Sequence, residues 1–555
     1  MIMIYQLEIM REMITKYLKN AISDGDLNER SYYGESFAAL SLLLTEDGKN
    51  EPFAETYLKL YKKKDKSVEN FHWEFNNYAL MKIRAMDKVK DIHTYLYPLH
   101  FKGTPCTNWT LLRAVCLAME GDIERACEIA EKKIISAQEE SGLIKDEENV
   151  ESLQYHAFSA LLLYELYELT GKKSYKERFI RAVYFSSNFV LSNGCSLFIG
   201  RGQEQIFGYG CLLYILTQGY LETGSKKMIF CLERVVKYIG SFCNNEGEVP
   251  LPLVLNRFEK NSKLTLEATD IRHLGWYPYN NYSDYIAFFC YYLSRTINLI
   301  KAAGINEIQE YLGEDNTEEY IEFKNRRYLV VKKKKYEAVL AVGGGYWTND
   351  LQFPLIVANE RVITPCYGGE QYAESLYSRE QSPMPWGKIS YPYGRGIMLV
   401  KNFIKTIIGI FDKRFFLRNS SDASIEKIDE DIFCLKIGFQ GVIFRRIFRF
   451  FDDYIEVTEQ LNFERRYCFE RFYFFNLWFF EDIKIDKKQK NIFRISPKII
   501  LELQHEECVH LGKETGYCAM GTLKNLTIFY KGIMPSEKVL DFPVDCNTLT
   551  GSVNL

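Results

Sequence analysis

The chain has 555 residues, of which 47% are hydrophobic and 15% aromatic, and its formal net charge is −3 with a pI near 6.3. This length exceeds the size at which one hydrophobic core keeps growing, which predicts more than one domain. The slightly acidic balance argues against a protein whose whole surface binds nucleic acid.

The aromatic content is the unusual part of the composition, with 39 Tyr and 38 Phe. Aromatic faces stack on the C–H faces of sugar rings, but Tyr and Phe also fill the wide cores of β-sandwiches. Composition alone leaves both interpretations open.

The 14 cysteines contain no C-x-x-C pair and no regular spacing. That pattern favours reduced thiols over a disulfide scaffold or a zinc ribbon, and no cofactor is expected from it, while a structural metal is neither predicted nor excluded. The first 20 residues place Glu8, Arg11 and Glu12 inside an apolar run, which is typical of an amphipathic helix and not of a signal peptide. No apolar run approaches the roughly 20 residues that span a bilayer, so the sequence predicts a cytoplasmic protein without membrane insertion.

Apolar residues recur at helical spacing from residue 1 to about 312. Short turns such as those at Gly121 and Gly171 separate the segments and favour antiparallel neighbours. A long series of helix pairs opens into a solenoid or closes into a ring, and the lack of a clean repeat favours the ring. Beyond the N-terminal helix, the predicted helices are Phe37–Leu44, Trp73–Ile83, Leu111–Met119, Ala126–Ala137, Leu153–Leu169, Tyr175–Leu191, Gln205–Leu221, Met228–Phe242 and Tyr285–Leu299.

Near Glu318 the sequence becomes rich in Val, Ile, Phe and Tyr, which predicts a large antiparallel β domain. Helices first and strands afterwards indicate two segregated domains, residues 1–315 and 316–555. The run Lys332–Lys335 is either an anion-binding patch or a solvated edge strand, and the edge strand is favoured. The stretches with strand character are 328–342, 353–365, 396–411, 441–463 and 473–485.

Five stretches in the helical part gather polar and aromatic residues at or near predicted helix starts. If the helices form a ring, the same ends of its inner helices meet around one cleft. The alternative is that each Trp anchors the core and each Asn or Ser caps a helix. The residues are His72, Trp73, Glu74 and Asn77; Asn108, Trp109 and Arg113; Glu151, Ser152, Tyr155 and His156; Arg201, Gln203, Gln205 and Tyr209; and His273, Trp276, Tyr277, Tyr279 and Asn280.

This inventory suits an extended acidic sugar, because aromatics stack on rings, amides bond hydroxyls and Arg pairs with a carboxylate. The chemistry that fits is β-elimination from a uronic-acid glycan, with Tyr and His as acid and base. Hydrolysis needs two facing carboxylic acids instead. Glu74, Glu151, Asp146 and Asp284 are available for it, but no paired spacing distinguishes them.

The segment from Asn108-Trp109 to Ser152-x-x-Tyr155-His156 resembles the heparinase II/III-like polysaccharide lyases, and the stretch around Asp350 resembles the Gly-rich strand pair of that family. The resemblance implies an incomplete (α/α) toroid followed by an antiparallel β-sandwich. It also implies that Tyr155 is the Brønsted acid, and a candidate for the base, and that Asn108 neutralises the substrate carboxylate.

The sequence departs from the family pattern at several positions. Ser141 stands where the family has the Asp of a D-G pair, and Val150 stands at the position of the motif's Glu. Trp109 and Thr348 occupy the positions of two family histidines. A substitute base would then come from His72, His156 or His273, or the reaction has been lost or changed.

We therefore expect a lyase acting on an acidic, uronate-containing bacterial glycan, with no nucleic acid as partner. The alternatives are a toroid-type glycoside hydrolase and a non-catalytic glycan-binding or assembly protein from a surface-polysaccharide gene cluster. The predicted catalytic residues are Tyr155, Asn108, His156, His72 and Arg201. The predicted substrate-binding residues are Trp73, Glu74, Asn77, Trp109, Gln203, Gln205, Trp276, Tyr277, Tyr279 and Asn280.

Overall fold

A computed structural model describes the chain in several stretches. The described residues are 2–23, 31–45, 48–67, 71–96, 101, 103–148, 150–243, 282–305, 319–342, 351–364, 386–389, 396–407, 414–416, 423–439, 442–463, 467–479, 484–485, 492–496, 499–502, 508–518, 521–534 and 537–545.

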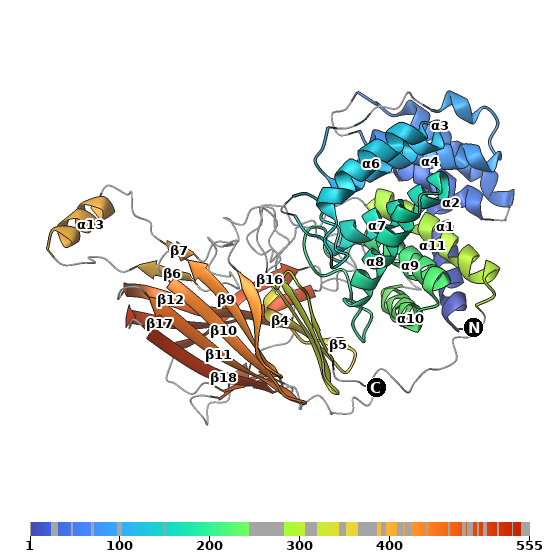
Figure 1. Ribbon diagram of the computed structural model, residues 1–555. Helices are drawn as coiled ribbons and strands as arrows, with labels where there is room; N and C mark the ends of the chain where they lie inside the picture. Colours follow the sequence, from blue (N-terminus) through green and yellow to red (C-terminus); the bar gives the residue numbers. More distant parts are fainter. Residues whose placement is uncertain are drawn as a thin grey trace. The chain divides into compact units, whose positions relative to one another are not determined.

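The described elements fall into two compact units. Helices α1 to α11 make up the helical unit, and all strands together with helix α13 make up the β unit (Figure 1). This order confirms the predicted helical part followed by an antiparallel β part. The predicted boundary at residues 315 and 316 lies outside the described residues and stays a prediction.

The predicted helices are present, and most bounds differ from the expected ones by only a few residues. One helix, α3, has no counterpart among the predictions, although its buried residues Ala54, Tyr57, Leu58 and Tyr61 repeat at helical spacing. The helices are α1 (Ile2–Ser23), α2 (Gly34–Leu44), α3 (Glu51–Lys63), α4 (Trp73–Met86), α5 (Thr107–Met119), α6 (Ile123–Ala137), α7 (Leu153–Thr170), α8 (Lys173–Ser187), α9 (Ile206–Thr223), α10 (Lys226–Gly240) and α11 (Tyr282–Ala302).

Helices α2, α4, α5, α7, α9 and α11 each pack against the next, and α11 packs back against α2, so that they form a ring. The remaining helices pack outside it, α1 on α11, α3 on α2, α6 on α5, α8 on α7 and α10 on α9. The sequence explains the two layers. Every residue of α9 from Ile206 to Gly219 is buried, whereas α10 buries one stripe that includes Leu232, Val236 and Ile239. Among the helices of the described residues, none is both long and apolar enough to cross a lipid bilayer.

A buried carboxylate joins several helices of the ring. Glu165 on α7 accepts a hydrogen bond from the Tyr78 hydroxyl of α4 at 2.7 Å and forms ion pairs with Lys82 of α4, at 3.1 Å, and Arg295 of α11. A charge with 1% exposure is tolerated only when cations and donors surround it. The cluster therefore fixes α4, α7 and α11 relative to one another near the C-terminal end of α7.

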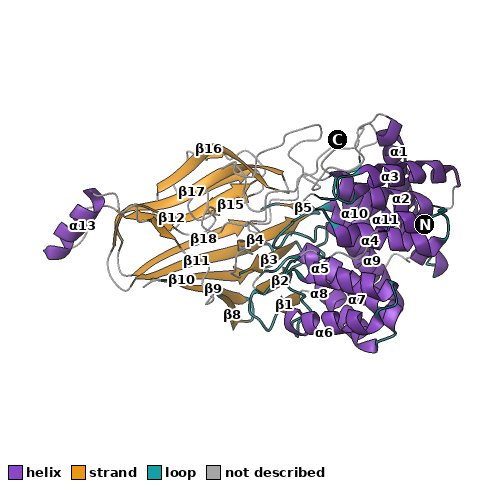
Figure 2. Ribbon diagram, turned by 90° about the horizontal axis from the view of Figure 1, so that it is seen from above, coloured by secondary structure: helices purple, strands orange, loops and turns teal. Residues whose placement is uncertain are grey.

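The β unit contains three antiparallel sheets. Their strand orders are β1-β2-β3-β4-β5, β13-β14-β15-β18-β11-β10-β9-β8 and β16-β17-β12-β6-β7. Figure 2 shows β18, β11, β10 and β9 of the second sheet side by side. The bounds are β1 (Glu319–Glu322), β2 (Tyr328–Lys332), β3 (Tyr336–Ala341), β4 (Leu351–Ala358), β5 (Arg361–Val362), β6 (Trp386–Ile389), β7 (Arg414–Phe416), β8 (Ser424–Asp429), β9 (Ile432–Phe439), β10 (Val442–Phe450), β11 (Tyr454–Phe463), β12 (Tyr467–Phe479), β13 (Lys484–Ile485), β14 (Ile492–Ser496), β15 (Ile499–Glu502), β16 (Cys508–Cys518), β17 (Gly521–Met534) and β18 (Glu537–Asp545).

Two predictions for the β part are wrong. Residues 396–411 were expected to form a strand, but helix α13 (Ile397–Ile407) occupies this stretch. Its Val and Ile residues favour strands, but the apolar side chains follow a spacing of three and four residues.

The run Lys332–Lys335 is not an edge strand, because it turns between β2 and β3, which are interior strands of their sheet. Lys333 is almost fully covered and lies 3.2 Å from Asp431.

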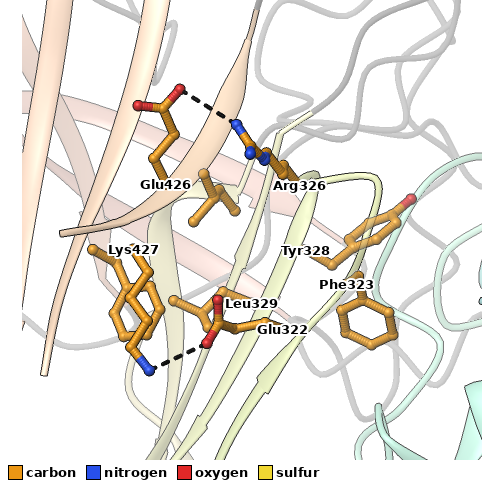
Figure 3. A pocket seen from close by; sticks show the side chains of 9 residues that line it. Glu322, Phe323, Arg326, Tyr328, Leu329, Glu426 and Lys427 are labelled. Carbon is orange, nitrogen blue, oxygen red and sulfur yellow. Dashed lines mark hydrogen bonds and ion pairs between the residues drawn. The ribbon is translucent and has the colours of Figure 1, made fainter. Parts of the chain in front are cut away.

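A cavity of about 370 Å³ lies where β1, β2 and the turn between them face β8 and β9 (Figure 3). Buried Leu329 and Phe433 line it, and two ion pairs stand around it, Arg326 with Glu426 at 3.9 Å and Lys427 with Glu322 at 3.3 Å. All four charged side chains are at least 40% exposed, so these pairs contribute little to stability.

An ion pair in the 8-stranded sheet is far more deeply buried. Arg446 of β10 and Glu459 of β11 are register partners, both 0% exposed and directly hydrogen-bonded. Burial raises the pKa of Glu459 to about 7, and Arg446 opposes that rise.

We predict that Arg446→Met lowers the free energy of unfolding by about 3–5 kcal/mol, because it leaves a buried carboxylate without its cation. Replacing both partners by apolar residues, Arg446→Met with Glu459→Leu, should cost clearly less. Arg449→Met is the matched control on the same strands, since Arg449 and its partner Glu456 are exposed, and its effect should stay below about 1 kcal/mol. Guanidinium unfolding of the full chain measures the free energy of unfolding of all three variants. Equal losses of this free energy in Arg446→Met and Arg449→Met would contradict the expectation.

Candidate active site

The start of α7 carries the central candidate, Tyr155. Ser152 is the N-cap residue, and its hydroxyl accepts a hydrogen bond from the Tyr155 backbone N–H at 3.2 Å. The same hydroxyl donates to the backbone oxygen of Arg201 at 2.5 Å. The cap considered from the sequence is thus present, and it also joins the helix start to the loop that carries Arg201.

Three residues of that loop have positive φ, Gly200, Gly202 and Glu204. Gly200 has φ +79°, and a Cβ there would lie 1.9 Å from the backbone oxygen of Glu151, so only glycine fits. Glu204 has φ +58° and 1% exposure. Its carboxylate accepts hydrogen bonds from the hydroxyls of Tyr209 and Tyr238 at 2.9 and 2.7 Å. A non-glycine residue in this conformation is uncommon, and the two phenols explain why it is stable here.

Glu204 is a residue that the sequence analysis missed. The signal was its place in the stretch Gly200–Gln205, where a carboxylate lies among glycines and amides directly before a largely apolar helix. Its position follows only from contacts with α9 and α10, which the local sequence does not reveal.

Arg201 lies between the ring of Tyr155 and two carboxylates. Its guanidinium carbon is 5.3 Å from the centroid of the Tyr155 ring, a distance typical of a cation–π contact. Its Nη1 is 3.3 Å from Asp146 Oδ2 and 3.9 Å from Glu147 Oε1. Burial raises the pKa of Asp146 to about 6, against the opposing effect of Arg201. Tyr155 and Arg201 are both partly exposed, so the pair can meet a ligand.

Cys106, Asp146 and Glu147 are the described residues whose side-chain atoms lie close enough to hold a metal ion, within 4.8 Å of one another. Burial raises the pKa of the Cys106 thiol to about 12, and this thiol donates to Glu147 at 3.2 Å. Arg201 already supplies a positive charge to the two carboxylates. The group is therefore better described as the acceptor set of Arg201 than as a metal centre.

Asn108 lies beside this group at the start of α5. The backbone N–H of Thr107 donates to the backbone oxygen of Asp146 at 2.6 Å, and this bond attaches the start of α5 to the segment before α7. The Asn108 side-chain oxygen accepts from the Trp109 N–H at 2.5 Å. The Asn108 side chain is only 3% exposed, and its amide nitrogen has no hydrogen-bond partner among the described residues.

Aromatic rings connect His72 to the other site residues. The His72 ring stacks on Tyr32 at 4.6 Å and meets Trp109 edge-on at 4.9 Å between centroids. Burial raises the pKa of neighbouring Tyr33, and the nearby Asp284 and Tyr155 raise it further. Tyr33, which the sequence analysis did not select, therefore lies between the His72 group and Tyr155.

Asp284 at the start of α11 holds the segment before α2 in place. Its carboxylate accepts backbone N–H groups from Tyr32, Tyr33 and Gly34, at 2.5 to 3.1 Å, and the Ser31 hydroxyl at 2.8 Å. A carboxylate with this many donors has a structural task. Together with the complete burial of Glu74, this arrangement does not favour the hydrolase alternative, which needs accessible carboxylic acids.

Several predicted site residues lie beneath the partly exposed group instead of in it. His156 is 0% exposed. Its Nδ1 accepts from the Ile144 N–H at 2.9 Å, so Nε2 carries the proton and faces the Ala182 oxygen at 3.0 Å. Burial lowers the pKa of His156 to about 4. This placement favours a structural role for His156 over the predicted catalytic one.

The predicted substrate-binding residues separate in the same way. Trp73 and Trp109 are partly exposed, whereas Glu74, Asn77, Gln203 and Gln205 are buried. Glu74 faces Arg113 at 3.4 Å, Gln205 accepts from Gln154, and both amide atoms of Asn77 lack a hydrogen-bond partner in the described part of the chain. Trp276, Tyr277, Tyr279 and Asn280, together with His273, lie outside the described residues.

The structure thus brings together the starts of α2, α4, α5, α7, α9 and α11. Of the predicted residues it places Tyr155, Asn108, Arg201, His72 and Trp109 in one continuous group. Beneath them lie packed rings such as Phe75, Phe158 and Phe207, with Tyr155 6.4 Å from Phe207.

No family model matches the sequence, and no curated protein matches it either. Solved structures do match. The Paenibacillus xanthan lyase has a TM-score of 0.54 at 8% identity, over 98% of this chain and 57% of that one. A Streptomyces coelicolor A3 chondroitin AC lyase, in complex with chondroitin sulphate, has a TM-score of 0.52 at 10% identity, over 98% of this chain and 79% of that one. The Pedobacter heparinus heparan sulfate lyase HepC has a TM-score of 0.34 at 10% identity, over 90% and 77%.

At this level of identity the first two matches show a shared fold and nothing finer. The likeness to polysaccharide lyases expected from the sequence is confirmed at that level.

We predict that the free energy of unfolding decreases as the pH is lowered, and that His156 causes part of this decrease. Its pKa is about 4 in the folded chain and about 6.5 when exposed, so the unfolded state binds the extra proton between these values. The stabilisation is complete above pH 6.5 and is lost as the pH falls toward 4. Between pH 7 and pH 5 this loss is about 2 kcal/mol.

Urea unfolding followed by circular dichroism at both pH values measures the effect. In His156→Asn the difference between the two pH values should shrink by about 2 kcal/mol, whatever the absolute stability of the variant. The control is His93→Asn, because His93 is exposed. An unchanged pH dependence in His156→Asn would show that the histidine titrates normally.

Proposed function

Because this chain has the fold of the polysaccharide lyases, we propose that it cleaves a uronate-containing glycan by β-elimination. In this proposal the ring of helices is the (α/α) toroid and the stacked sheets are the β-sandwich. The observation that carries the proposal is the placement of Arg201 over Tyr155, beside the donor of Asn108. The chondroitin sulphate bound to one structural neighbour supports an acidic glycan as substrate.

Tyr155 is the proposed proton carrier. β-Elimination removes the C5 proton of the uronate, moves the C5–H electrons into a C4–C5 double bond and expels the C4 oxygen, which takes up a proton. A partly exposed phenol beside a guanidinium can take the first proton as phenolate and return it to the leaving oxygen. One residue then performs both steps. The use of one residue for both proton transfers fits a chain in which His156 is buried and His72 is held among aromatic rings.

Arg201 and Asn108 are the proposed electrostatic partners. The guanidinium favours the ionised phenol by its positive charge. The free amide donor of Asn108 suits the uronate carboxylate, on which negative charge grows as the C5 proton leaves. Trp109 and Trp73 are partly exposed aromatic residues, a type on which neighbouring sugars stack.

Asp146 is the proposed positioning residue for Arg201. It is 1% exposed and holds the guanidinium at 3.3 Å. A substrate carboxylate that approaches Arg201 competes with Asp146 for the same cation.

We predict that Tyr155→Phe lowers turnover by about a hundredfold or more, because it removes the proton carrier and leaves the ring in place. The assay is the ultraviolet absorbance of the unsaturated uronate product, recorded across a panel of uronate glycans. Tyr184→Phe is the control, since Tyr184 is 43% exposed on α8. Full activity in Tyr155→Phe would remove the proposed mechanism. New reducing ends without the absorbance would indicate a hydrolase, and glycan binding without any product would indicate a binding protein.

We also predict that Arg201→Met moves the midpoint of the pH–activity curve to higher pH, since the phenolate that takes the C5 proton loses the neighbouring cation. Activity measured against pH on the same glycan gives the midpoint. Arg84→Met is the control, because Arg84 pairs with Glu120 at the exposed end of α4. A lower turnover with an unchanged midpoint would mean that Arg201 binds substrate without acting on Tyr155.

A further inference from the structure

Helix α13, labelled in Figure 1, carries several exposed apolar side chains. Its side chains Ile397, Val400, Phe403 and Ile404 are 86%, 56%, 54% and 52% exposed. The other large apolar side chains that are exposed in the described residues are scattered over separate elements. Isolated exposed apolar residues are normal, but a group of four on one eleven-residue helix indicates a contact surface.

The spacing makes the helix amphipathic. Ile397, Val400, Phe403, Ile404 and Ile407 follow one another at intervals of three, three, one and three residues, which places them along one side. Lys401 and Lys405, four residues apart, flank this side, since Lys401 comes four residues after Ile397 and three before Ile404. Apolar residues along one side with basic residues at its edge are typical of helices that lie in the surface of a membrane.

The charge around α13 differs from that of the chain as a whole. Residues 381–411 contain Lys388, Arg395, Lys401 and Lys405 and no Asp or Glu, whereas the whole chain carries a net charge of −3. A segment with only positive charge is attracted to an anionic surface.

We propose that α13 is a membrane-surface anchor, whose apolar side enters the headgroup region of an anionic lipid bilayer while the lysines contact the lipid phosphates. A bilayer accepts a short helix, because each apolar side chain enters it independently. A stable contact between two protein chains buries at least about 1,200 Å², which four side chains on an eleven-residue helix do not supply. The anchor lies in the surface, consistent with the finding that no described helix is suited to crossing a bilayer.

The test is flotation of the full chain with lipid vesicles, and it needs no glycan, so its outcome is independent of the proposed lyase reaction. Vesicles of phosphatidylcholine mixed with phosphatidylglycerol should carry the chain, and vesicles of phosphatidylcholine alone should carry much less. The double variant Val400→Glu with Phe403→Glu should bind the anionic vesicles about tenfold more weakly. Ile135→Glu on α6 is the matched control, because Ile135 is 68% exposed and stands alone, and it should bind like the original chain.

Four results would overturn the anchor. The first is an absence of binding to anionic vesicles, and the second is equal binding by the double variant. In the third, light scattering finds a dimer of the chain that the double variant loses, which would mean that a second copy covers the helix. In the fourth, the double variant unfolds at a clearly lower denaturant concentration than Ile135→Glu, which would mean that the chain itself covers the helix.

Discussion

The hydroxyl of Ser152 is the contact on which the candidate site depends. It accepts the backbone N–H of Tyr155 and donates to the backbone oxygen of Arg201, so one side chain sets the positions of both residues. The adjoining backbone bond from the Leu153 N–H to the Ile199 oxygen, at 3.1 Å, extends the same attachment. Without this connection the loop that carries the guanidinium would not be attached to the helix start that carries the phenol.

Glu204 completes the constraint from the other end of the loop. Its carboxylate is held by Tyr209 of α9 and Tyr238 of α10, so the loop is fixed to two helices as well as to the start of α7. Arg201 then has little freedom to leave the ring of Tyr155, and a rigid pair of this kind is what proton transfer requires.

Much of the fold could be predicted from the sequence, because it depends on local patterns. Helical spacing located α7 and α9, and the Ser152 cap followed from residue type alone. The failures have physical causes. Residues 396–411 carry β-favouring Val and Ile, and only their spacing indicated helix α13. Side-chain burial was the least predictable property. His156 follows Tyr155 directly but points into the core, because successive residues of a helix lie 100° apart, and nothing in the local sequence fixed which of the two would face outward.

Asp284 has a consequence for how the protein is made. It binds the backbone of Tyr32, Tyr33 and Gly34 across some 250 residues of sequence. A ribosome releases the first helices long before α11 exists, so the segment next to Tyr33 remains without its anchor until most of the helical unit has been synthesised. The nascent chain therefore exposes apolar helix faces for an extended time. A fragment that ends before α11 would keep Tyr155 and Arg201 but would lack the anchor that holds Tyr33 beside them.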